Sequence, residues 1–468
     1  MPTSVAIHPT NINGLLVIDL PLFADDRGWF KENWQREKML TLGLPDFGPV
    51  VQNNMSFNTA RGATRGIHAE PWDKYIGLGT GRIFGAWVDL REGSITYGQT
   101  YTHELGPESA VFVPRGVGNS YQALEDGTLY SYLVNEHWSA ELKSQYTFVN
   151  LGDPALAIPW PIPLAQAEVS DADKAHPLLA DVTPMAPRKT IIIGAGGQLG
   201  LALQAVLPSA VALTQEQLDL RYPDQIAAID WASVGTVINA AAYTAVDAAE
   251  TPEGRRDCWD VNVTALGHLV EVCRTHRITL VHISSDYVFD GTIPEHDEDE
   301  SFSPLGVYGQ TKASGDALVA TLPRHYIART SWVIGQGNNF VRTMAGLAER
   351  GVQPAVVDDQ LGRLTFTSDL AAAIVHLLAS QAPYGTYNVT NSGPVTSWYE
   401  LACDVFALTG HDAVAVSPTT TDAYTADKPG TALRPRHSTL SLAKLEATGF
   451  HMPDAGLRLR EYLAGSAE

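Results

Sequence analysis

The sequence predicts a multidomain protein in which an all-β unit is followed by an α/β unit with a parallel sheet. Short apolar or alternating runs fill the first part of the chain, separated by glycine, proline and aspartate. From about residue 189, apolar strands alternate with helical patterns, which is typical of a doubly wound sheet. Prolines at 177, 184 and 187 lie between the two parts, in a stretch without clear periodicity.

The chain has 468 residues, which is long enough for two or three domains with separate cores. We expect one domain at residues 1–183, a linker at 184–188 and a second domain at 189–468.

Composition predicts a soluble cytoplasmic protein. No apolar run is long enough to cross a bilayer, and the N-terminus lacks the pattern of a signal peptide, so no membrane partner is expected. The formal net charge of -21 would repel a nucleic-acid backbone, which excludes nucleic acid as an expected partner. Cys258, Cys273 and Cys403 are scattered, so we expect small buried side chains and no disulfide framework.

Strands are expected in the first half at 15–20, 83–90, 110–113 and 129–134, which together indicate a sandwich or small barrel. Polar residues that do not fit solvated turns gather in a few short motifs. These are Asp26-Arg27-Gly28-Trp29-Phe30-Lys31-Glu32, Gln52-Asn53-Asn54-Met55-Ser56, Arg65-Gly66-Ile67-His68 with Lys74, Val113-Pro114-Arg115-Gly116, and Tyr130.

With Val88-Asp89-Leu90-Arg91 and the run from Asp153 to Pro161, these motifs make nearly the whole first half resemble the dTDP-4-dehydrorhamnose 3,5-epimerase family, a jelly-roll cupin. The resemblance implies that His68 is the base, that Asp173 orients it, and that Tyr130 returns a proton from the opposite face. It also implies that Lys74 stabilises the enolate oxygen. The implied sugar-nucleotide site is lined by Arg27, Glu32, Gln52, Arg65 and Asn119.

The chemistry independently requires such a set. A hydrogen next to a ketone is only weakly acidic, so a base of near-neutral pKa must act together with a cation at the developing oxyanion. Two departures from the family pattern bear on substrate detail and efficiency: Asn119 stands where the family has a second histidine, and Gly85 stands where it commonly has aspartate. No H-x-H pair is present, so no metal is predicted.

A glycine-rich turn opens the second half. Three isoleucines precede Gly194, and Gly197 and Gly200 follow at three-residue spacing, which predicts a strand, a tight turn and a helix that together cradle a pyrophosphate. This spacing suits the short-chain reductase variant of the dinucleotide-binding motif. Further strands are expected at 210–213, 236–239, 279–283 and 326–329, with a helix through 262–274.

A catalytic set for ketone reduction follows. Ser285 ends a predicted strand, and the four-residue step places Tyr308 and Lys312 on one face of a helix. The new alkoxide needs a proton donor, and a phenol beside a cationic lysine is expected to have a lowered pKa. A serine hydroxyl at the carbonyl would fix its orientation.

The second half resembles dTDP-4-dehydrorhamnose reductase, an extended short-chain dehydrogenase with a Rossmann fold and a small C-terminal substrate region. The motifs that carry this resemblance include Asn239 to Asp247, Ser284 to Gly291, Arg329 to Gly335 and Asp358 to Gly362. It implies cofactor contacts from Gly194, Gly197, Gln198, Leu199, Gly200, Asp219, Leu220, Ala241, Ala242, Tyr243, Tyr308 and Lys312. The implied substrate contacts are Asp286, Tyr287, Trp332 and Arg434.

Two features of the second half stay open. Thr214-Gln215 ends the second predicted strand without an acid or an arginine, so spacing does not decide between NADPH and NADH, although the resemblance favours NADPH. The acidic run from Glu295 to Glu300 is expected to be a solvated loop.

Together the halves predict a bifunctional enzyme that epimerises dTDP-4-dehydro-6-deoxy-D-glucose and then reduces it to dTDP-L-rhamnose. One alternative is a reductase whose cupin half is a non-catalytic binding or dimerisation module. Another is a reductase that yields the 6-deoxy-L-talose nucleotide. A homodimer formed through the first half is expected from the resemblance.

Overall fold

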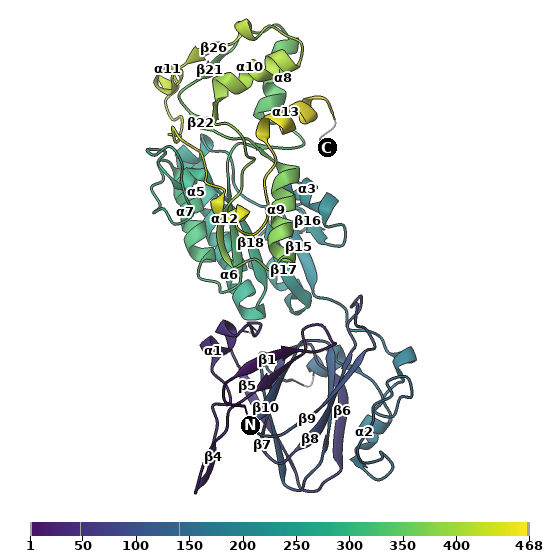
Figure 1. The fold of residues 1–468 in the computed structure, drawn as a ribbon. Coiled ribbons are helices and arrows are strands. Elements are labelled where there is room, and N and C mark those ends of the chain that lie inside the picture. Colours follow the sequence, from purple (N-terminus) through teal and green to yellow (C-terminus); the bar gives the residue numbers. More distant parts are fainter. Residues whose placement is uncertain (1, 47, 140, 466–468) are drawn as a thin grey trace. The chain divides into compact units, whose positions relative to one another are not determined.

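The computed structural model describes residues 2–46, 48–139 and 141–465. It divides into two compact units, one ending at Pro187 and the other beginning at Arg188 (Figure 1). Each unit has its own sheets and its own hydrophobic clusters, so each is described by itself.

The first unit contains two six-stranded sheets, antiparallel except for one short pairing between β14 and β6. The first sheet consists, in spatial order, of β1 (Ala6–Pro9), β2 (Leu16–Asp19), β10 (Ser109–Val113), β7 (Lys74–Thr80), β12 (Thr128–Val134) and β5 (Gln52–Asn58). The second consists of β13 (Thr147–Phe148), β6 (Ala63–Ala69), β11 (Val117–Ala123), β8 (Ile83–Asp89) and β9 (Thr100–Leu105), with β14 (Glu168–Val169) beside β6.

The core of this unit lies between the sheets. Every residue of β8 and β11 is buried, because both faces of these strands are covered. Ile76 of β7 and Trp87 of β8 are fully buried members of one apolar cluster that joins the two sheets. The four expected strands of the first half coincide with β2, β8, β10 and β12.

The side chains of strand β5 alternate between inside and outside in the opposite sense to those of a normal edge strand. Gln52, Asn54 and Ser56 are half-buried, whereas Met55 and Phe57 are 64% and 62% exposed. A strand with one face on a core usually points its apolar side chains inward. In β5 the polar side chains face the interior, and the apolar ones face outward.

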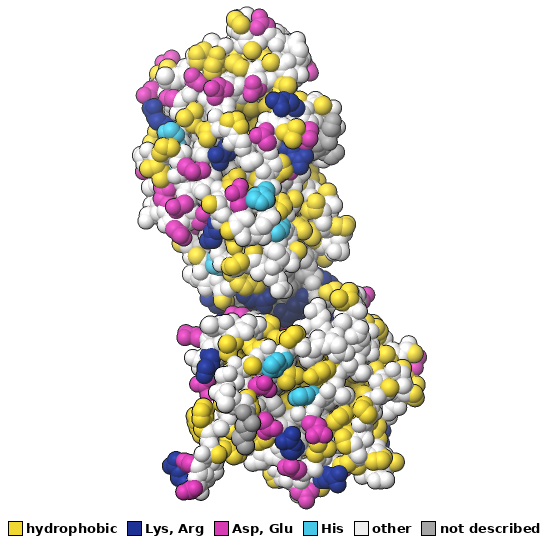
Figure 2. Space-filling model, viewed as in Figure 1, with side chains coloured by type: hydrophobic (Ala, Val, Ile, Leu, Met, Phe, Trp, Pro, Cys, Tyr) yellow, Lys and Arg dark blue, Asp and Glu magenta, His cyan; other side chains and the backbone are white. Residues whose placement is uncertain are grey.

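A short hairpin projects from the first unit. It is formed by β3 (Phe23–Asp25) and β4 (Gly28–Phe30), which pair antiparallel, and charged side chains gather at its tip (Figures 1 and 2). It also carries three large apolar side chains: Phe23 is 62%, Trp29 43% and Phe30 68% exposed. The helix α1 (Arg36–Thr41) follows it.

The last segment of the first unit wraps back over the second sheet. It contains η1 (Glu141–Gln145), α2 (Asp171–Lys174) and η2 (Leu179–Asp181). Met185 is buried, and its N–H donates to the carbonyl of Leu90. The chain therefore stays packed on this unit as far as Met185, inside the stretch predicted as a linker.

The second unit is built on a parallel sheet, with α3 and α9 packed on one face and α6 on the other. Its strands are, in spatial order, β16 (Val211–Leu213), β15 (Lys189–Ile193), β17 (Val234–Asn239), β18 (Thr279–Ser285), β19 (His325–Thr330) and β24 (Gly385–Asn388). The helices and turns up to residue 379 are α3 (Gln198–Val206), α4 (Pro223–Ala227), η3 (Trp231–Ser233), η4 (Ala248–Glu250), α5 (Pro252–Trp259), η5 (Asp260–Thr264), α6 (Ala265–His276), η6 (Asp286–Val288), α7 (Val307–Val319), α8 (Phe340–Glu349) and α9 (Thr367–Ala379).

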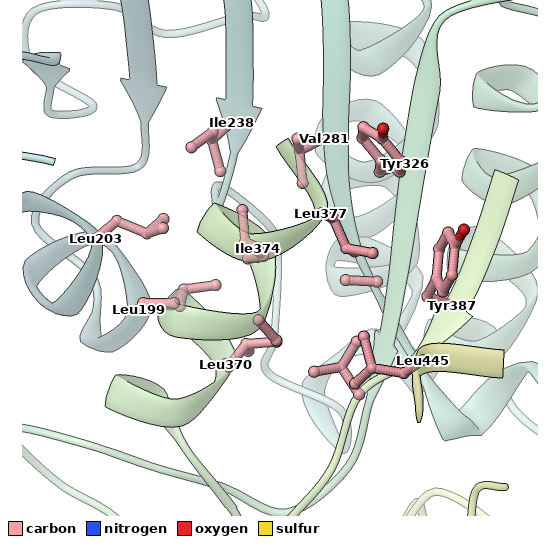
Figure 3. Packing of buried hydrophobic residues seen from close by; sticks show 14 of the residues in the cluster. Leu199, Leu203, Ile238, Val281, Tyr326, Leu370, Ile374, Leu377, Tyr387 and Leu445 are labelled. Carbon is pink, nitrogen blue, oxygen red and sulfur yellow. The ribbon is translucent and has the colours of Figure 1, made fainter. Parts of the chain in front are cut away.

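Figure 3 shows how one face of this sheet is covered. Leu199 and Leu203 of α3 and Ile374 of α9 point toward Ile238 of β17 and Val281 of β18. All five side chains are buried, and their removal from water stabilises the βαβ arrangement. The glycine turn between β15 and α3 is thereby fixed against the sheet.

The helix expected at 262–274 is interrupted. A π-helical turn, η5, separates α5 from α6. Asn262 in that turn accepts a hydrogen bond from the N–H of Tyr243 at 2.8 Å and donates to its carbonyl at 3.1 Å. Such π turns are often found at functional sites, and this one holds the segment after β17.

A smaller region lies beyond β19. Its core joins α8, α10 and α13. The remaining elements are β20 (Val333–Ile334), β21 (Ala355–Val357), β22 (Leu361–Gly362), β23 (Thr365–Phe366), β25 (Thr396–Ser397), α10 (Trp398–Leu408), η7 (Ala413–Ala415), β26 (Ser417–Thr419), α11 (Thr421–Thr425), α12 (Ala443–Glu446) and α13 (Ala455–Leu463).

The acidic run 295–300 is a loop, as predicted, and Glu295, Asp297 and Asp299 are exposed, but the run is not solvated throughout. His296 is fully buried, with Nδ1 2.7 Å from the carboxylate of Glu300 and Nε2 3.1 Å from the carbonyl of His437. Glu298 accepts a hydrogen bond from the N–H of Asn388, and burial raises the pKa of its carboxyl. The run is tied into the fold by contacts with residues about 90 and 140 positions later.

No helix in the described ranges combines the length and the apolarity needed to cross a membrane. Cys258 and Cys273 are buried, as expected, whereas Cys403 is only partly buried; all three are free thiols.

Candidate active sites

Strand β6 presents the first candidate site. Gly66 precedes Ile67 and His68, and its φ of +117° lies where side chains are disfavoured. A Cβ on Gly66 would approach the Cβ of Ser120 to 2.5 Å. Glycine is therefore required for β6 to lie against β11 just before His68.

His68 and Asp173 form a pair. The Nε2 atom of His68 lies 2.8 Å from Oδ1 of Asp173. Asp173 lies in the short helix α2, whose N-cap is Ser170. Burial acts to raise the pKa of Asp173, but the hydrogen bond and charge of His68 outweigh it, and the pKa is lowered. An ionised carboxylate can only accept, so Nε2 carries a proton, and in the neutral imidazole the lone pair is on Nδ1.

His176 completes this group and was missed from the sequence. Its Nε2 lies 3.9 Å from Oδ1 of Asp173, and its ring stacks on Phe148 at 4.7 Å between centroids. Burial and the charge of His68 lower its pKa. The donor atoms of His68, Asp173 and His176 lie within 4.8 Å of one another, a set that could also hold a metal ion, although no H-x-H motif signals it.

Lys74 lies in a second charged group on β7. Its Nζ is 2.5 Å from a carboxylate oxygen of Glu70 and 4.8 Å from the ring centroid of Tyr132. Glu70 follows His68 by two residues, just beyond the end of β6. Burial and then the charge of Glu70 raise the pKa of Tyr132 to about 12, so its phenol keeps a proton to donate at neutral pH.

Tyr130 lies deeper than its predicted role requires. It is only 3% exposed, its ring stacks on Tyr121 at 4.2 Å, and its hydroxyl accepts a hydrogen bond from the amide of Asn119 at 3.1 Å. Asn119 is the cross-strand partner of His68. The two residues thus form part of the buried interior, and Tyr132, two positions along the same strand, lies beside Lys74.

The predicted substrate residues of the first half are dispersed. Arg65 is exposed on β6, and its charge lowers the pKa of Tyr121 against the larger effect of burial. Gln52 lies on β5, where it accepts a hydrogen bond from the N–H of Trp138 at 3.1 Å. Glu32 pairs with Lys38 at 2.7 Å. Arg27 pairs with Asp25 on the projecting hairpin, and its side chain is 90% exposed.

The second unit contains a cavity of about 760 Å³ beside the glycine turn. Gly194 and Gly197 line it, whereas Gly200 packs against the turn, where a Cβ would meet the carbonyl of Gly194 at 2.3 Å. A Cβ on Gly194 would meet the N atom of Ala241 at 2.6 Å. The turn therefore needs both glycines, as the sequence predicts.

Most predicted cofactor residues line this cavity. They are Gly194, Gly197, Asp219, Leu220, Ala241, Ala242 and Tyr243. Gln198 and Leu199 lie at the start of α3, where Leu199 belongs to the core. Arg221, which was not predicted, also lines the cavity and pairs with Asp219 at 2.6 Å.

Ser285, Tyr308 and Lys312 converge from β18 and α7. Lys312 is 2% exposed, and its Nζ donates to the carbonyl of Ile283 at 2.5 Å. Burial lowers its pKa to about 8. The ring of Tyr308 packs edge-on against Tyr287 at 5.6 Å.

The expectation of a lowered phenol pKa was wrong for the ligand-free protein. Burial first, and then the charge of Asp286, raise the pKa of Tyr308 well above its usual range, and hydrogen bonding with Ser285 offsets only part of this. Lys312 does not reverse the shift. Tyr308 consequently stays protonated over the whole neutral range, as a proton donor must.

The predicted substrate residues of the second half flank this set. Asp286 is buried and accepts a hydrogen bond from the hydroxyl of Ser285 at 2.9 Å. Burial raises the pKa of Asp286 to about 6. Trp332 has a φ of +46° and stacks on Trp398 at 3.7 Å. Arg434 donates to both oxygens of Asp247, at 2.9 and 3.0 Å, so its guanidinium is already engaged by a carboxylate.

The cavity fits a dinucleotide. Glycines form its phosphate end, and nothing lies within 4 Å of a Cβ built on Gly196, so the backbone there is open to a ligand. Tyr243 lines the cavity and also packs against the cluster that Tyr308 contacts. A cofactor bound there would therefore extend from the glycine turn toward Tyr308.

Comparison with known proteins gives two family matches. A family model described as dTDP-4-dehydrorhamnose 3,5-epimerase matches residues 9–181, and one described as RmlD substrate binding domain matches residues 188–467. A protein named RmlC homolog from Streptococcus pyogenes serotype M6 is 52% identical over 181 residues, which are 38% of this chain and 90% of that protein.

The second half has relatives of its own. A dTDP-4-dehydrorhamnose reductase from Aggregatibacter actinomycetemcomitans is 37% identical over 277 residues, covering 55% of this chain and 92% of that protein. A crystal structure of dTDP-4-dehydrorhamnose reductase from Bacillus anthracis in complex with NADP is 32% identical, with a TM-score of 0.55. The match covers 60% of this chain and 99% of the Bacillus anthracis chain.

Proposed function

The chain belongs to the dTDP-4-dehydrorhamnose 3,5-epimerase family through its first half and to the RmlD family through its second, and on that premise we propose that it is a bifunctional enzyme that makes dTDP-L-rhamnose. It epimerises dTDP-4-dehydro-6-deoxy-D-glucose at C3 and C5 and then reduces the C4 ketone with a reduced nicotinamide. One observation carries this proposal: a single chain holds a His–Asp pair and a buried lysine in its first unit, and a Ser–Tyr–Lys set and a dinucleotide cavity in its second.

The order of the two reactions follows from their chemistry. The C4 ketone is what makes the hydrogens at C3 and C5 acidic, because it delocalises the charge of the carbanion. Epimerisation must therefore precede reduction. Reduction then removes the ketone and fixes the new configuration.

For the first reaction we propose His68 as the base. Its free Nδ1 takes the proton from the sugar carbon, and Asp173, bonded at Nε2, stabilises the imidazolium that results. Lys74 supplies positive charge to the enolate oxygen. We propose that Tyr132, and not the buried Tyr130, returns a proton from the opposite face, because only Tyr132 lies beside Lys74.

The residues of the first site need no metal for these steps. Nε2 of His68 must keep the proton that it donates to Asp173, and a cation bound between His68, Asp173 and His176 would take its place. We propose that this group works as a proton relay. Arg65, Gln52 and Asn119 are proposed to contact the sugar nucleotide.

For the second reaction we propose that Tyr308 gives its phenolic proton to the alkoxide formed at C4. A bound NADPH or NADH supplies the hydride. Lys312 places positive charge near the phenolate that remains, and Ser285 donates a hydrogen bond to the substrate carbonyl. Asp286, Tyr287, Trp332 and Arg434 are proposed as substrate contacts, which requires Arg434 to exchange Asp247 for a substrate phosphate.

The cofactor is NADPH or NADH. Gly194, Gly197, Asp219 and Leu220 are proposed to hold it, together with Ala241, Ala242 and Tyr243. Gln198, Leu199 and Gly200 contribute through the start of α3, whose N-terminal end favours the pyrophosphate.

We also propose that the first unit is a jelly-roll cupin and the second a Rossmann-fold reductase, joined by the few residues after Met185. A homodimer formed through the first unit is supported by two exposed apolar surfaces. These are the hairpin with Phe23, Trp29 and Phe30, and the outward face of β5 with Met55 and Phe57. Arg27 lies on that hairpin, and we propose that it contacts the sugar nucleotide bound by a second copy.

Two measurements on the purified full chain test the proposal. In deuterated water without cofactor, the keto-sugar nucleotide should gain deuterium at C3 and C5; absence of label would leave the first half as a binding or dimerisation module. With NADPH, the product sugar should be L-rhamnose. Recovery of 6-deoxy-L-talose would show that hydride reaches the other face of C4.

A further inference from the structure

The cavity of the second unit has a phosphate end and an adenosine end. Its phosphate end is the glycine turn, where the N–H groups of Gly194 and Ala195 donate to the carbonyl of Leu213, the last residue of β16. In dinucleotide-binding sheets, the ribose of the adenosine half lies at the carboxyl end of this second strand. Thr214, Gln215 and Glu216 follow β16 directly and line the cavity.

Arg221 is the one basic side chain at this end. Among the described residues that line the cavity, no other lysine or arginine is present, whereas Glu216, Asp219 and Asp257 are acidic. A phosphate group on the ribose would need a cation to offset these charges. Arg221 is the only lining residue that can supply one.

The guanidinium of Arg221 is held in place by Asp219. Nε lies 3.0 and 3.1 Å from the two carboxylate oxygens, and Nη2 lies 2.6 Å from Oδ2. Gln215 donates to the same carboxylate at 3.3 Å, which links this pair to the residues that follow β16. The pair therefore lies next to the expected ribose position.

Part of Arg221 remains available to a ligand. Its side chain is 31% exposed, and within the described part of the chain no hydrogen bond engages Nη1. A planar guanidinium that is already oriented loses little rotational freedom when it binds a phosphate.

We propose that Arg221, held by Asp219, binds the 2′-phosphate of NADPH and makes this enzyme prefer NADPH to NADH. The inference rests on the proposed reductase function, because it assigns a role within that cofactor cavity. Glu216 has the opposite effect: its carboxylate repels a 2′-phosphate and can accept a hydrogen bond from the free ribose hydroxyl of NADH.

Binding of nucleotide fragments to the full chain tests this without measuring catalysis. Isothermal titration of adenosine 2′,5′-bisphosphate and of 5′-AMP should show at least about tenfold tighter binding of the bisphosphate, as expected for one charge-assisted contact. Arg221→Gln should remove that difference and leave the affinity for 5′-AMP within about twofold. Glu216→Gln should enlarge it.

Arg274→Gln is the matched control, since Arg274 is also exposed and paired with an acid, Glu271 at 3.6 Å, but does not line the cavity. An unchanged ratio in Arg221→Gln, or equal binding of both fragments by the unsubstituted chain, overturns the proposal. Loss of both fragments in Arg221→Gln also overturns it, because Arg221 would then support the adenosine pocket in general. Failure of the unsubstituted chain to bind either fragment would instead count against the reductase cavity itself.

Discussion

The ammonium of Lys74 lies over the ring of Tyr132, 4.8 Å from its centroid, while the hydroxyl of Tyr130 on the same strand is bonded to Asn119 in the interior. Cations favour the face of an aromatic ring, so Lys74 and Tyr132 are held together. This contact distinguishes Tyr132 from Tyr130, the tyrosine to which the family resemblance assigns the acid role.

Replacing these tyrosines separately should give opposite results. Tyr132→Phe removes the proposed proton donor, and epimerisation should fall by about 10²–10⁴-fold, the usual range for general acid catalysis. Tyr130→Phe should retain most activity but lower the free energy of unfolding by about 1 kcal/mol, because it removes one buried hydrogen bond. Product formation and urea unfolding measure the two effects. A larger loss of epimerisation in Tyr130→Phe would return the acid role to Tyr130.

His68→Asn and Asp173→Asn should each slow deuterium incorporation at C3 and C5, the first by about 10²–10⁴-fold. Asp173→Asn should be less severe, since the base remains but loses its charged partner. His8→Asn is a matched control, because His8 also lies 2.8 Å from an aspartate, Asp19, on the surface of the first unit. Exchange rates in deuterated water are the measurement, and equal slowing by the control would attribute the loss to stability.

The double variant Tyr308→Phe with Lys312→Ala should lose most cofactor oxidation, again by about 10²–10⁴-fold. Its deuterium exchange at C3 and C5 should continue at the original rate. The reason is that the two reactions use separate residue sets in separate units. Absorbance at the nicotinamide band and mass spectrometry of the sugar follow the two reactions in one sample. Normal oxidation in the double variant would eliminate this set as the reductase site.

Asp286→Asn should stabilise the second unit. The folded protein raises the pKa of Asp286 from 3.8 to about 6, so the unfolded chain releases this proton at lower pH than the folded one. Stability is thereby lost as pH rises between the two values and stays reduced above about pH 6. The variant should therefore gain about 1–3 kcal/mol in unfolding free energy at neutral pH and little near pH 4.

Urea unfolding at both pH values measures this gain, with the transition of the second unit identified by its shift on addition of NADPH. Asp427→Asn, at an exposed position, should show no comparable gain. The same gain at both pH values would mean that burial of the charged carboxylate is not its cause.

Substituting Phe23, Trp29 and Phe30 by serine should convert the proposed dimer to a monomer, because these side chains expose apolar area that a second copy would cover. Sedimentation equilibrium measures the change. Ile95→Ser is the control, since Ile95 is 90% exposed on the same unit but lies outside the hairpin. A monomeric unsubstituted chain would refute the dimer.

The sequence predicted those features that depend on local spacing. The four-residue step from Tyr308 to Lys312, the glycine turn and the apolar strand runs are all set by neighbours along the chain. The cavity residues Asp219 and Tyr243 followed from motifs at the ends of strands, where parallel sheets bring segments together.

Features that depend on distant segments were missed. His296 is buried in part because the chain near His437 returns to it, 141 positions later. Tyr130 and Tyr132 share one face of β12, and the depth of each depends on the facing sheet. His176 follows α2 with no motif of its own, and its role depends on where Phe148 and His68 lie.

Strand β5 ends its sheet and carries apolar side chains on its outward face. An edge of this kind offers a row of free backbone groups to any extended chain, and so invites open-ended aggregation. The proposed two-fold pairing would close the edge, because each copy would occupy the other's surface and leave none for a third. Variants that disrupt the pairing should consequently lose solubility before they lose their fold. A poor yield of such a variant would then indicate an uncovered edge strand rather than a misfolded protein.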